Sequence, residues 1–270
     1  MYLKFFFSAI FGAAQGITEF LPISSSGHLI ILHKFSNLDV DNLIFDVALH
    51  LGSLLALFIY FRKKIYSLFS VFGKADKQQD KSKKNLRLFF FIFFATIPAG
   101  LIGFFFEDAI ESYFRNITVV SLTLIIGGIL LIIVDKYSKK QKDIYSLSAT
   151  EIFLIGIAQA FALIPGVSRS ATTIIAGLGL KLQRKAAAEF SFLLAIPIIF
   201  GAVAKKMFDL NLAILSTLDK LIFLIGILSS FVVSYLVIKY FIKFLEKHSL
   251  VWFGWYRILL GFIILLWMFI

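Results

Sequence analysis

Long apolar segments separated by short charged segments dominate this chain. The apolar stretches long enough to matter are 43–61, 88–106, 118–134, 186–204, 221–238 and 251–270. A helix needs about 20 mostly apolar residues to cross the hydrocarbon core of a bilayer. The pattern therefore predicts an all-α integral membrane protein in which each of these stretches is a transmembrane helix.

Two further apolar regions, 2–33 and 150–183, are interrupted near their middle by Pro, Gly and clustered Ser. Pro and Gly at such positions break a helix. Non-helical backbone is tolerated at membrane depth only where protein or a water-filled cavity satisfies its polar groups. Each region is therefore predicted to form a re-entrant helical hairpin, which enters the membrane and returns to the same face.

The charges between the spans predict an orientation. Segment 62–87 contains nine Lys and Arg residues against two Asp residues, and segment 135–149 is also rich in Lys, whereas segment 107–117 is mainly acidic. By the positive-inside rule, 62–87 and 135–149 are expected to be cytoplasmic loops and 107–117 to lie outside. The first hairpin would then enter from the outer face and the second from the cytoplasm.

The two halves of the chain share a short pattern. The sequence Gly-Ala-Ala-Gln at 12–15 resembles Gly-Ile-Ala-Gln at 156–159, and Pro-x-Ser-Ser-Ser at 22–26 resembles Pro-x-x-Ser-Arg-Ser at 165–170. Chance recurrence of Gln, Pro and Ser in a chain rich in small residues is the alternative explanation, because the matched identities are few.

The repeat has a topological consequence. Each copy is a re-entrant helical hairpin followed by three transmembrane helices, and a unit with an odd number of crossings is inverted when it is repeated. We therefore predict a single membrane domain over 1–270 with an inverted-topology repeat, whose halves span about 1–135 and about 150–270. Binding sites in such proteins lie near the midplane, where the broken elements meet.

Composition agrees with a membrane environment and excludes several classes of function. The chain is 60% hydrophobic with a mean hydropathy of +0.92, more than one soluble core of 270 residues could bury. The net charge of +11 lies in the gaps between apolar runs and on no amphipathic face, so we expect no nucleic-acid partner. The absence of Cys excludes disulfides and a cysteine nucleophile.

Ionisable side chains inside a membrane are costly, so they are candidates for function. The first hairpin contains Gln15, Glu19 and His28, and the second contains Arg169. Gln15 and Glu19 are four residues apart and share one helical face. Ser-rich strings in membrane helices often serve only backbone hydrogen bonding and close packing, but a carboxylate, an imidazole and a guanidinium at two broken hairpins would be costly to keep without a role.

These residue types suit a diphosphate group. A guanidinium binds phosphate oxygens in a bidentate fork, and amides at a helix start donate to anions. A carboxylate can bind a divalent cation or act as a base, and an imidazole can act as a nucleophile or carry a proton. Phosphoryl transfer mainly needs positioning and charge stabilisation, which this set supplies.

The same motifs resemble the two signature stretches of the undecaprenyl-diphosphate phosphatase family, also called bacitracin resistance proteins. The resemblance rests on 15–28 and 165–170, includes 189–197, and extends over essentially the whole chain. It implies hydrolysis of undecaprenyl diphosphate to undecaprenyl phosphate and inorganic phosphate, which recycles the carrier lipid for peptidoglycan synthesis and confers bacitracin resistance. It also implies the bacterial plasma membrane, with an active site that opens to the outer, periplasmic face.

The resemblance further implies a set of site residues and a cofactor. The family requires a divalent cation, Mg²⁺ or Ca²⁺, for which Glu19 would be a ligand. Its acidic motif is Glu or Gln, three residues, then Glu, and this chain has the Gln form, which leaves Glu19 as the only carboxylate. The implied catalytic residues are Glu19, Ser25, His28 and Arg169, and the implied substrate-binding residues are Gln15, Ser24, Ser26, Gly27, Gly166, Ser168, Ser170 and Thr173.

The sequence leaves several alternatives open. The nucleophile could be His28, Ser25 or a water molecule. A transporter or flippase for a polyprenyl phosphate or another anion would also use inverted repeats with broken helices, although such a carrier has little need of a nucleophile. The partners expected are the polyprenyl diphosphate substrate, whose tail would lie along the apolar spans, and the lipid bilayer. A homodimer is compatible with the sequence, which does not fix the oligomeric state.

Overall fold

The computed structural model describes residues 2–36, 38, 40, 42–70, 79–209 and 216–268. The secondary structure of these residues is helical apart from one isolated bridge between Lys142 and Leu182, so the predicted all-α class is confirmed. In chain order the helices are α1 (Tyr2–Thr18), α2 (Ser25–Phe35), α3 (Asn42–Tyr60), α4 (Arg62–Phe69), α5 (Gln79–Phe114), α6 (Ile117–Tyr137), the 3₁₀ turn η2 (Ile144–Ser146), α7 (Ala149–Phe161), α8 (Arg169–Gly179), α9 (Arg184–Asp209), α10 (Thr217–Phe244) and α11 (Val251–Trp267).

Among the described residues, five helices are long and apolar enough to cross a membrane: α3, α5, α6, α9 and α10. Helix α11 is apolar but shorter, with 17 residues, and the last two residues of its predicted span lie outside the described residues. The chain is therefore a multi-pass membrane protein.

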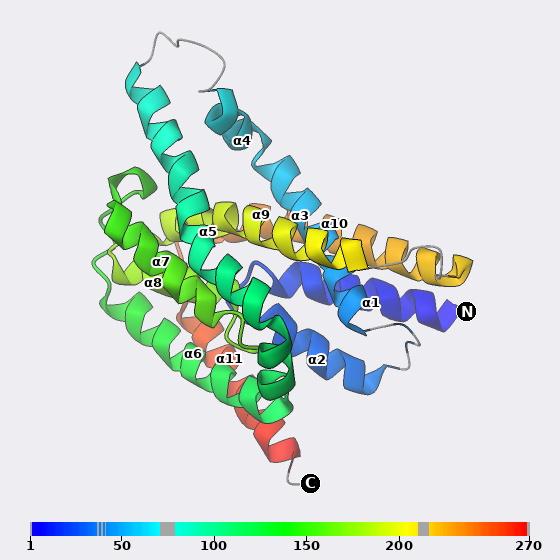
Figure 1. Ribbon diagram of the computed structural model, residues 1–270. Coiled ribbons are helices and arrows are strands. Elements are labelled where there is room, and N and C mark those ends of the chain that lie inside the picture. The colour runs from blue at the N-terminus through cyan, green and yellow to red at the C-terminus, as the bar shows by residue number, and fades with distance from the viewer. Residues whose placement is uncertain are drawn as a thin grey trace.

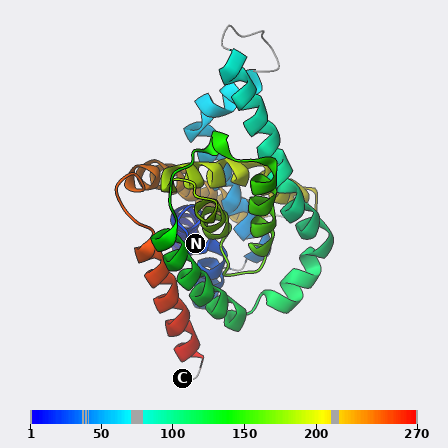
Figure 2. The same ribbon diagram turned by 90° about the vertical axis from the view of Figure 1, so that its left-hand side faces the viewer.

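Two segments predicted as loops are largely helical. In 62–87 the structure has α4 and the start of α5, which project beyond the other helices (Figures 1 and 2). Residues 71–78, with part of the charge used for orientation, lie outside the described residues. In 107–117, α5 continues to Phe114. The prediction failed because polarity was taken to end a helix, whereas Lys, Gln and Glu are good helix formers.

Both predicted hairpins have the expected break. Helices α1 and α2 are separated by 19–24 and α7 and α8 by 162–168, the segments that contain Pro22 and Pro165. In each break a serine has a positive φ of 75°, Ser24 in the first and Ser168 in the second. Each of these serines caps the helix that follows, since the hydroxyl of Ser24 accepts from the Gly27 N–H and that of Ser168 from the Ala171 N–H. The two turns therefore share one local geometry.

Polar contacts connect the ends of several helices at two opposite faces of the protein. On one, the Asp135 face, the buried carboxylate of Asp135 accepts from Arg184 Nε at 2.6 Å and from the Leu250 N–H at 3.1 Å, which ties α6 to the starts of α9 and α11. On the other, the Asp46 face, Asp46 contacts His33 at 2.8 Å and Arg115 at 3.2 Å. Figure 1 shows α7 and α8 on the left and α1 and α2 on the right of the molecule.

Small residues allow close packing of α1 and α3 against α10. The Ser8 hydroxyl donates to the Ile222 carbonyl at 2.5 Å, and the Ser53 hydroxyl lies 3.0 Å from that of Ser234. A Cβ added at Gly16 would lie 2.8 Å from the Ser234 backbone nitrogen. Because lipid is as apolar as Leu, membrane helices associate through such close contacts and hydrogen bonds. This interface fixes the end of α1, and so positions Glu19.

We predict that Gly16→Ala destabilises the protein by about 1–3 kcal/mol, because the new methyl group meets backbone atoms of α10 that cannot move aside. The measurement is the melting temperature in detergent, with Gly201→Ala as the control, since a Cβ at Gly201 has nothing within 4 Å. Equal melting temperatures for the two variants would contradict this account of the interface.

Candidate active site

The two hairpin turns meet each other inside the protein. The Gly166 N–H donates to the Ser26 hydroxyl at 3.3 Å, and the Ser170 hydroxyl donates to the Leu21 carbonyl at 3.0 Å. Arg169 Nη2 of the second turn lies 3.0 Å from Glu19 Oε1 of the first. Residues about 150 positions apart in the sequence therefore form one site.

Glu19 is the centre of this site. Its carboxylate is buried and its Oε1 accepts from Arg169. Its Oε2 accepts from the Ser25 hydroxyl at 2.7 Å and from Gln15 Nε2 at 3.1 Å, and it lies 3.5 Å from His50 Nε2. The predicted pairing of Gln15 and Glu19 on one helical face thus corresponds to a direct hydrogen bond.

Arg169 is held from its other side by α9. Its Nη1 donates to the Ser191 carbonyl at 2.9 Å, and the Thr173 hydroxyl donates to the Ser191 hydroxyl at 2.7 Å. The Nε of Arg169 is buried and has no hydrogen-bond partner among the described residues. A guanidinium held at both ends in this way has little freedom, so its charge stays beside Glu19.

Ser25 is the hydroxyl best placed for chemistry. It is half-buried at the first position of α2, and its oxygen donates to Glu19 Oε2 at 2.7 Å. A carboxylate at that distance can accept the hydroxyl proton as the oxygen attacks an electrophile. In the first turn of α2 the Gly27 and His28 amides already donate to Ser24, whereas the Ser25 and Ser26 amides have no preceding carbonyl within the helix and can donate to an anion at the same place.

His28 is oriented by different groups. Its Nδ1 lies 2.7 Å from the Ser24 carbonyl and its Nε2 lies 2.7 Å from the Tyr256 hydroxyl. Since a carbonyl only accepts, Nδ1 carries the proton, and Nε2 of the neutral ring accepts from Tyr256. The lone pair of His28 is therefore directed at α11 and not at Ser25 or Glu19.

The remaining predicted residues lie in or beside the two turns and differ in burial. The side chains of Ser24, Ser168, Ser170 and Thr173 are buried and their hydroxyls bond to backbone or to each other. Ser26 is exposed, and Gly166 has a φ of 88°, which a residue with a side chain rarely adopts. Gln15 Oε1 is buried without a hydrogen-bond partner among the described residues. The site assignment itself stays a prediction.

Three neighbouring residues were not among the predicted site residues: His50, Tyr256 and Arg257. His50 contacts Glu19 and Tyr256 binds His28, while Arg257 donates to the carbonyls of both turns. In the sequence, the place of His50 in a span suits either a partner of the site or an interfacial residue, and Tyr256 beside two Trp residues suits an interfacial aromatic belt. The signal that could have found Arg257 is an arginine within an apolar span, which is rarely kept without a role.

The predicted divalent cation does not fit a site made by these side chains alone. Among the described residues no group of three or more His, Asp or Glu is placed to hold a metal. A carboxylate has about four lone-pair directions, and Glu19 already faces Arg169, Ser25, Gln15 and His50. A cation at Glu19 would have to displace one of these donors.

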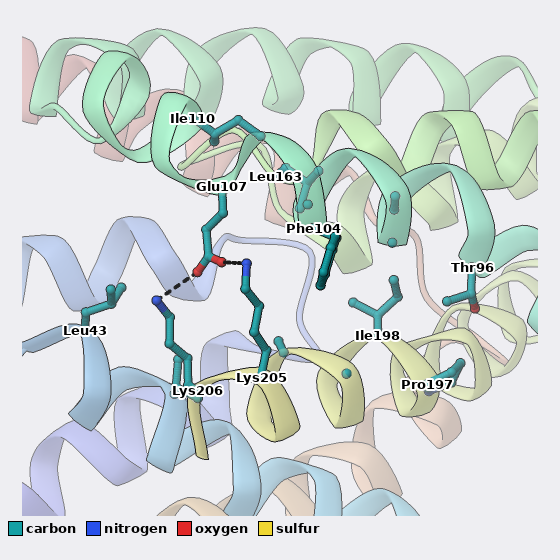
Figure 3. Close-up of a pocket in the computed structure, with 16 residues that line it drawn as sticks. Leu43, Thr96, Phe104, Glu107, Ile110, Leu163, Pro197, Ile198, Lys205 and Lys206 are labelled. Atoms are coloured by element: carbon teal, nitrogen blue, oxygen red, sulfur yellow. Dashed lines mark hydrogen bonds and ion pairs between the residues drawn. The ribbon is translucent and has the colours of Figure 1, made fainter. Parts of the chain in front are cut away.

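An apolar cavity of about 430 Å³ lies between α5 and α9, beside the start of α3. Glu107 of α5 faces Lys205 and Lys206 of α9 at one end of it (Figure 3). Neither Glu19, Ser25 nor Arg169 lines this cavity, but Leu163, which belongs to the second turn, does. The cavity therefore extends from the neighbourhood of that turn along the C-terminal halves of α5 and α9.

Comparison with known proteins identifies the family. The model of the family described as bacitracin resistance protein BacA matches residues 8–263. The chain is 40% identical to undecaprenyl-diphosphatase 1 of Clostridioides difficile, with 99% of this chain and 97% of that protein aligned. It is 42% identical to the undecaprenyl-diphosphatase of Aliivibrio salmonicida, with 99% and 98% aligned, and 42% identical to that of Trichlorobacter lovleyi, with 94% and 93% aligned.

A family match over nearly the whole chain, together with full-length relatives at this level of identity, shows that the chain belongs to the bacitracin resistance protein BacA family.

Proposed function

We propose that this protein hydrolyses undecaprenyl diphosphate to undecaprenyl phosphate and inorganic phosphate. The name undecaprenyl-diphosphatase of its full-length relatives gives the reaction. The observation that carries the proposal is the arrangement of Ser25, Glu19 and Arg169, in which a hydroxyl and a guanidinium bond to the two oxygens of one buried carboxylate. A purely structural pair would not need the hydroxyl at a helix start.

In the proposed mechanism Ser25 is the nucleophile. Arg169 and the first two amides of α2 and of α8, which the serine caps leave available, hold the diphosphate oxygens. Glu19 accepts the proton of the Ser25 hydroxyl as its oxygen attacks the terminal phosphorus, and undecaprenyl phosphate leaves. Water then hydrolyses the phosphoserine and releases inorganic phosphate. Of the nucleophiles left open by the sequence, His28 is disfavoured because both of its ring nitrogens are engaged elsewhere.

The requirement for Mg²⁺ or Ca²⁺ stays a prediction from the family resemblance. We revise the proposed ligands of the ion, for which the resemblance implies Glu19. Because the donors around Glu19 leave little room for an ion, we propose that a cation arrives on the oxygens of the diphosphate and is not held by the protein beforehand. Such an ion would neutralise charge on the phosphate groups. The roles of Ser25, Glu19 and Arg169 do not depend on it.

The prenyl tail has a proposed place in the cavity between α5 and α9. This cavity is almost entirely apolar apart from the charged residues at one end, and Leu163 brings it close to the second turn. A polyprenyl chain is a flexible hydrocarbon that would gain from leaving the lipid only where protein atoms pack against it. Three of the residues that line the cavity have no side chain and so leave space for a prenyl chain: Gly100, Gly103 and Gly201.

The proposal includes the topology predicted from the sequence. The ends of α7 and α8 belong to the Asp135 face and those of α1 and α2 to the Asp46 face, which supports two hairpins that enter from opposite sides in an inverted-topology repeat. With the Lys-rich segments in the cytoplasm, the Asp46 face would be periplasmic and the protein would lie in the bacterial plasma membrane. A homodimer stays a prediction.

Loss of any of the three central residues should abolish the reaction. We expect Glu19→Ala, Ser25→Ala and Arg169→Ala each to lower kcat/KM at least 100-fold, because each removes a base, a nucleophile or charge stabilisation. The measurement is phosphate release from a long-chain prenyl diphosphate by purified protein in detergent, with and without a chelator. Ser112→Ala, an exposed serine in α5, is the matched control.

Two results of that assay would change the conclusion. Wild-type protein that releases no phosphate in the presence of a divalent cation would exclude the phosphatase and favour a transporter or flippase, which moves the lipid intact. Full activity of Ser25→Ala would reassign the nucleophile to water or His28.

Filling the cavity should affect long substrates selectively. A Cβ at Gly201 meets nothing within 4 Å, so Gly201→Leu would place its side chain in the cavity without strain. We expect KM for a long-chain prenyl diphosphate to rise at least fivefold, and KM for a one-isoprene diphosphate to stay the same. Gly179→Leu is the control, because Gly179 is equally open and lies away from the cavity. An equal effect on both substrates would contradict this place for the tail.

A further inference from the structure

Arg257 lies in the apolar helix α11 and is completely buried. Its guanidinium donates to backbone carbonyls of three separate segments. In the first turn it bonds to Pro22 at 3.2 Å, and in the second turn to Gly166 at 3.2 Å and Val167 at 3.0 Å. In α6 it bonds to the carbonyls of Thr123 and Leu124 at 3.2 and 3.3 Å.

The charge of this guanidinium is not neutralised by a carboxylate. All the partners of Arg257 just named are neutral carbonyls, and among the described residues no Asp or Glu lies within 4 Å of its nitrogens. Buried charges are normally paired, since isolation from water is costly. In these contacts the positive charge of Arg257, directly behind the two turns, is compensated only by the dipoles of carbonyl groups.

Helix α6 is shaped to make room for this side chain. A Cβ at Gly127 would lie directly against Nη2 of Arg257 and 2.9 Å from its Cζ. Gly128 lets the helices α6 and α11 approach closely, because a Cβ there would lie 2.6 Å from the Gly254 carbonyl oxygen. The two consecutive glycines thus have different effects on the packing: Gly128 allows the two helices to approach, and Gly127 leaves space for the Arg257 guanidinium.

The bonds to the turn carbonyls also set the direction of amides. In a trans peptide the C=O and the following N–H point in opposite directions. Because the Val167 carbonyl is held toward Arg257, the N–H of Ser168 lies on the far side of its peptide plane, next to the start of α8. The guanidinium therefore orients a donor of the second turn as well as holding the two turns together.

We propose that Arg257 is a positioning residue for diphosphate binding, which joins the two hairpin turns through their carbonyls and supplies the unpaired positive charge behind them. The inference rests on the proposed function and extends it to a residue outside both signature motifs. It also accounts for the contact between α11 and the site, where the neighbouring Tyr256 orients His28.

The test compares four variants at equal amounts of folded protein: Arg257→Met, Arg257→Lys, Gly127→Ala and Gly179→Ala. Because Arg257→Met leaves buried carbonyls of both turns without a donor, we expect the melting temperature of this variant to be lower than that of wild type. We expect its KM for a long-chain prenyl diphosphate to rise at least tenfold, and Arg257→Lys, which keeps the charge but not the fork, to recover part of the loss.

Each outcome decides for or against the proposal. A KM for Arg257→Met within threefold of wild type, or Arg257→Lys as impaired as Arg257→Met, would overturn it. If Arg257→Met does not fold, Gly127→Ala decides, because it keeps the arginine and displaces its guanidinium. A fivefold rise in KM is then expected for Gly127→Ala with no change for Gly179→Ala, which has open space around its Cβ and lies away from the cavity. Equal values for these two would overturn the proposal.

A binding measurement separates this inference from the proposed function. The probe is a non-hydrolysable prenyl methylenebisphosphonate, titrated against wild type and Arg257→Met and followed by calorimetry. Wild-type protein without phosphatase activity would defeat the proposed function, and a tenfold weaker Kd for Arg257→Met would still support the role of Arg257. An unchanged Kd would defeat that role, whatever the activity of the wild type.

Discussion

Backbone that leaves the helical conformation inside a membrane must find hydrogen-bond partners within the protein, and this constraint governs the centre of the molecule. The turns at 19–24 and 162–168 satisfy part of the need themselves, through the caps formed by Ser24 and Ser168. They satisfy another part through each other, by way of Ser26 and Ser170. Further turn carbonyls accept hydrogen bonds from Arg257. Among the contacts described above, it is the only group that donates to both turns.

The chemistry is a consequence of the same arrangement. Because each turn ends in a helix start, amides that lack a carbonyl within the helix are brought to one place from two sides. The ion pair of Glu19 and Arg169 joins the two turns. Ser25, the first residue of α2, then donates its hydroxyl to the other oxygen of the carboxylate. The proposed site for the diphosphate head group thus lies where the two interrupted hairpins meet.

Sequence alone was sufficient for the features that depend on composition and on local breaks. The spans follow from the length of apolar runs, and the turns from Pro22, Pro165 and the serines beside them. Sequence is insufficient where a contact between distant segments decides the surroundings of a residue. It leaves His28, Ser25 and water open as the nucleophile, and only the fold shows that the ring nitrogens of His28 lie on Ser24 and Tyr256.

Arg257 and segment 62–87 also show what sequence alone does not reveal. Arg257 stands close to Trp and Tyr in a C-terminal span, where arginine commonly marks the membrane interface, and only the fold places it beneath both turns. The charge of segment 62–87 predicts a loop, yet charge does not determine whether a polar segment is helical. In neither case do the neighbouring residues in the chain reveal what the fold shows.

The bond between Glu19 and Arg169 has a mechanical consequence. Each partner belongs to a different half of the protein, so the bond works as a latch across the boundary at which the halves would rock in an alternating-access cycle. Rocking would pull the guanidinium from the carboxylate and take apart the group that polarises Ser25. Under the proposed function, cleavage of the lipid requires this bond to be closed, whereas passage of the lipid across the bilayer by rocking of the halves would require it to be open.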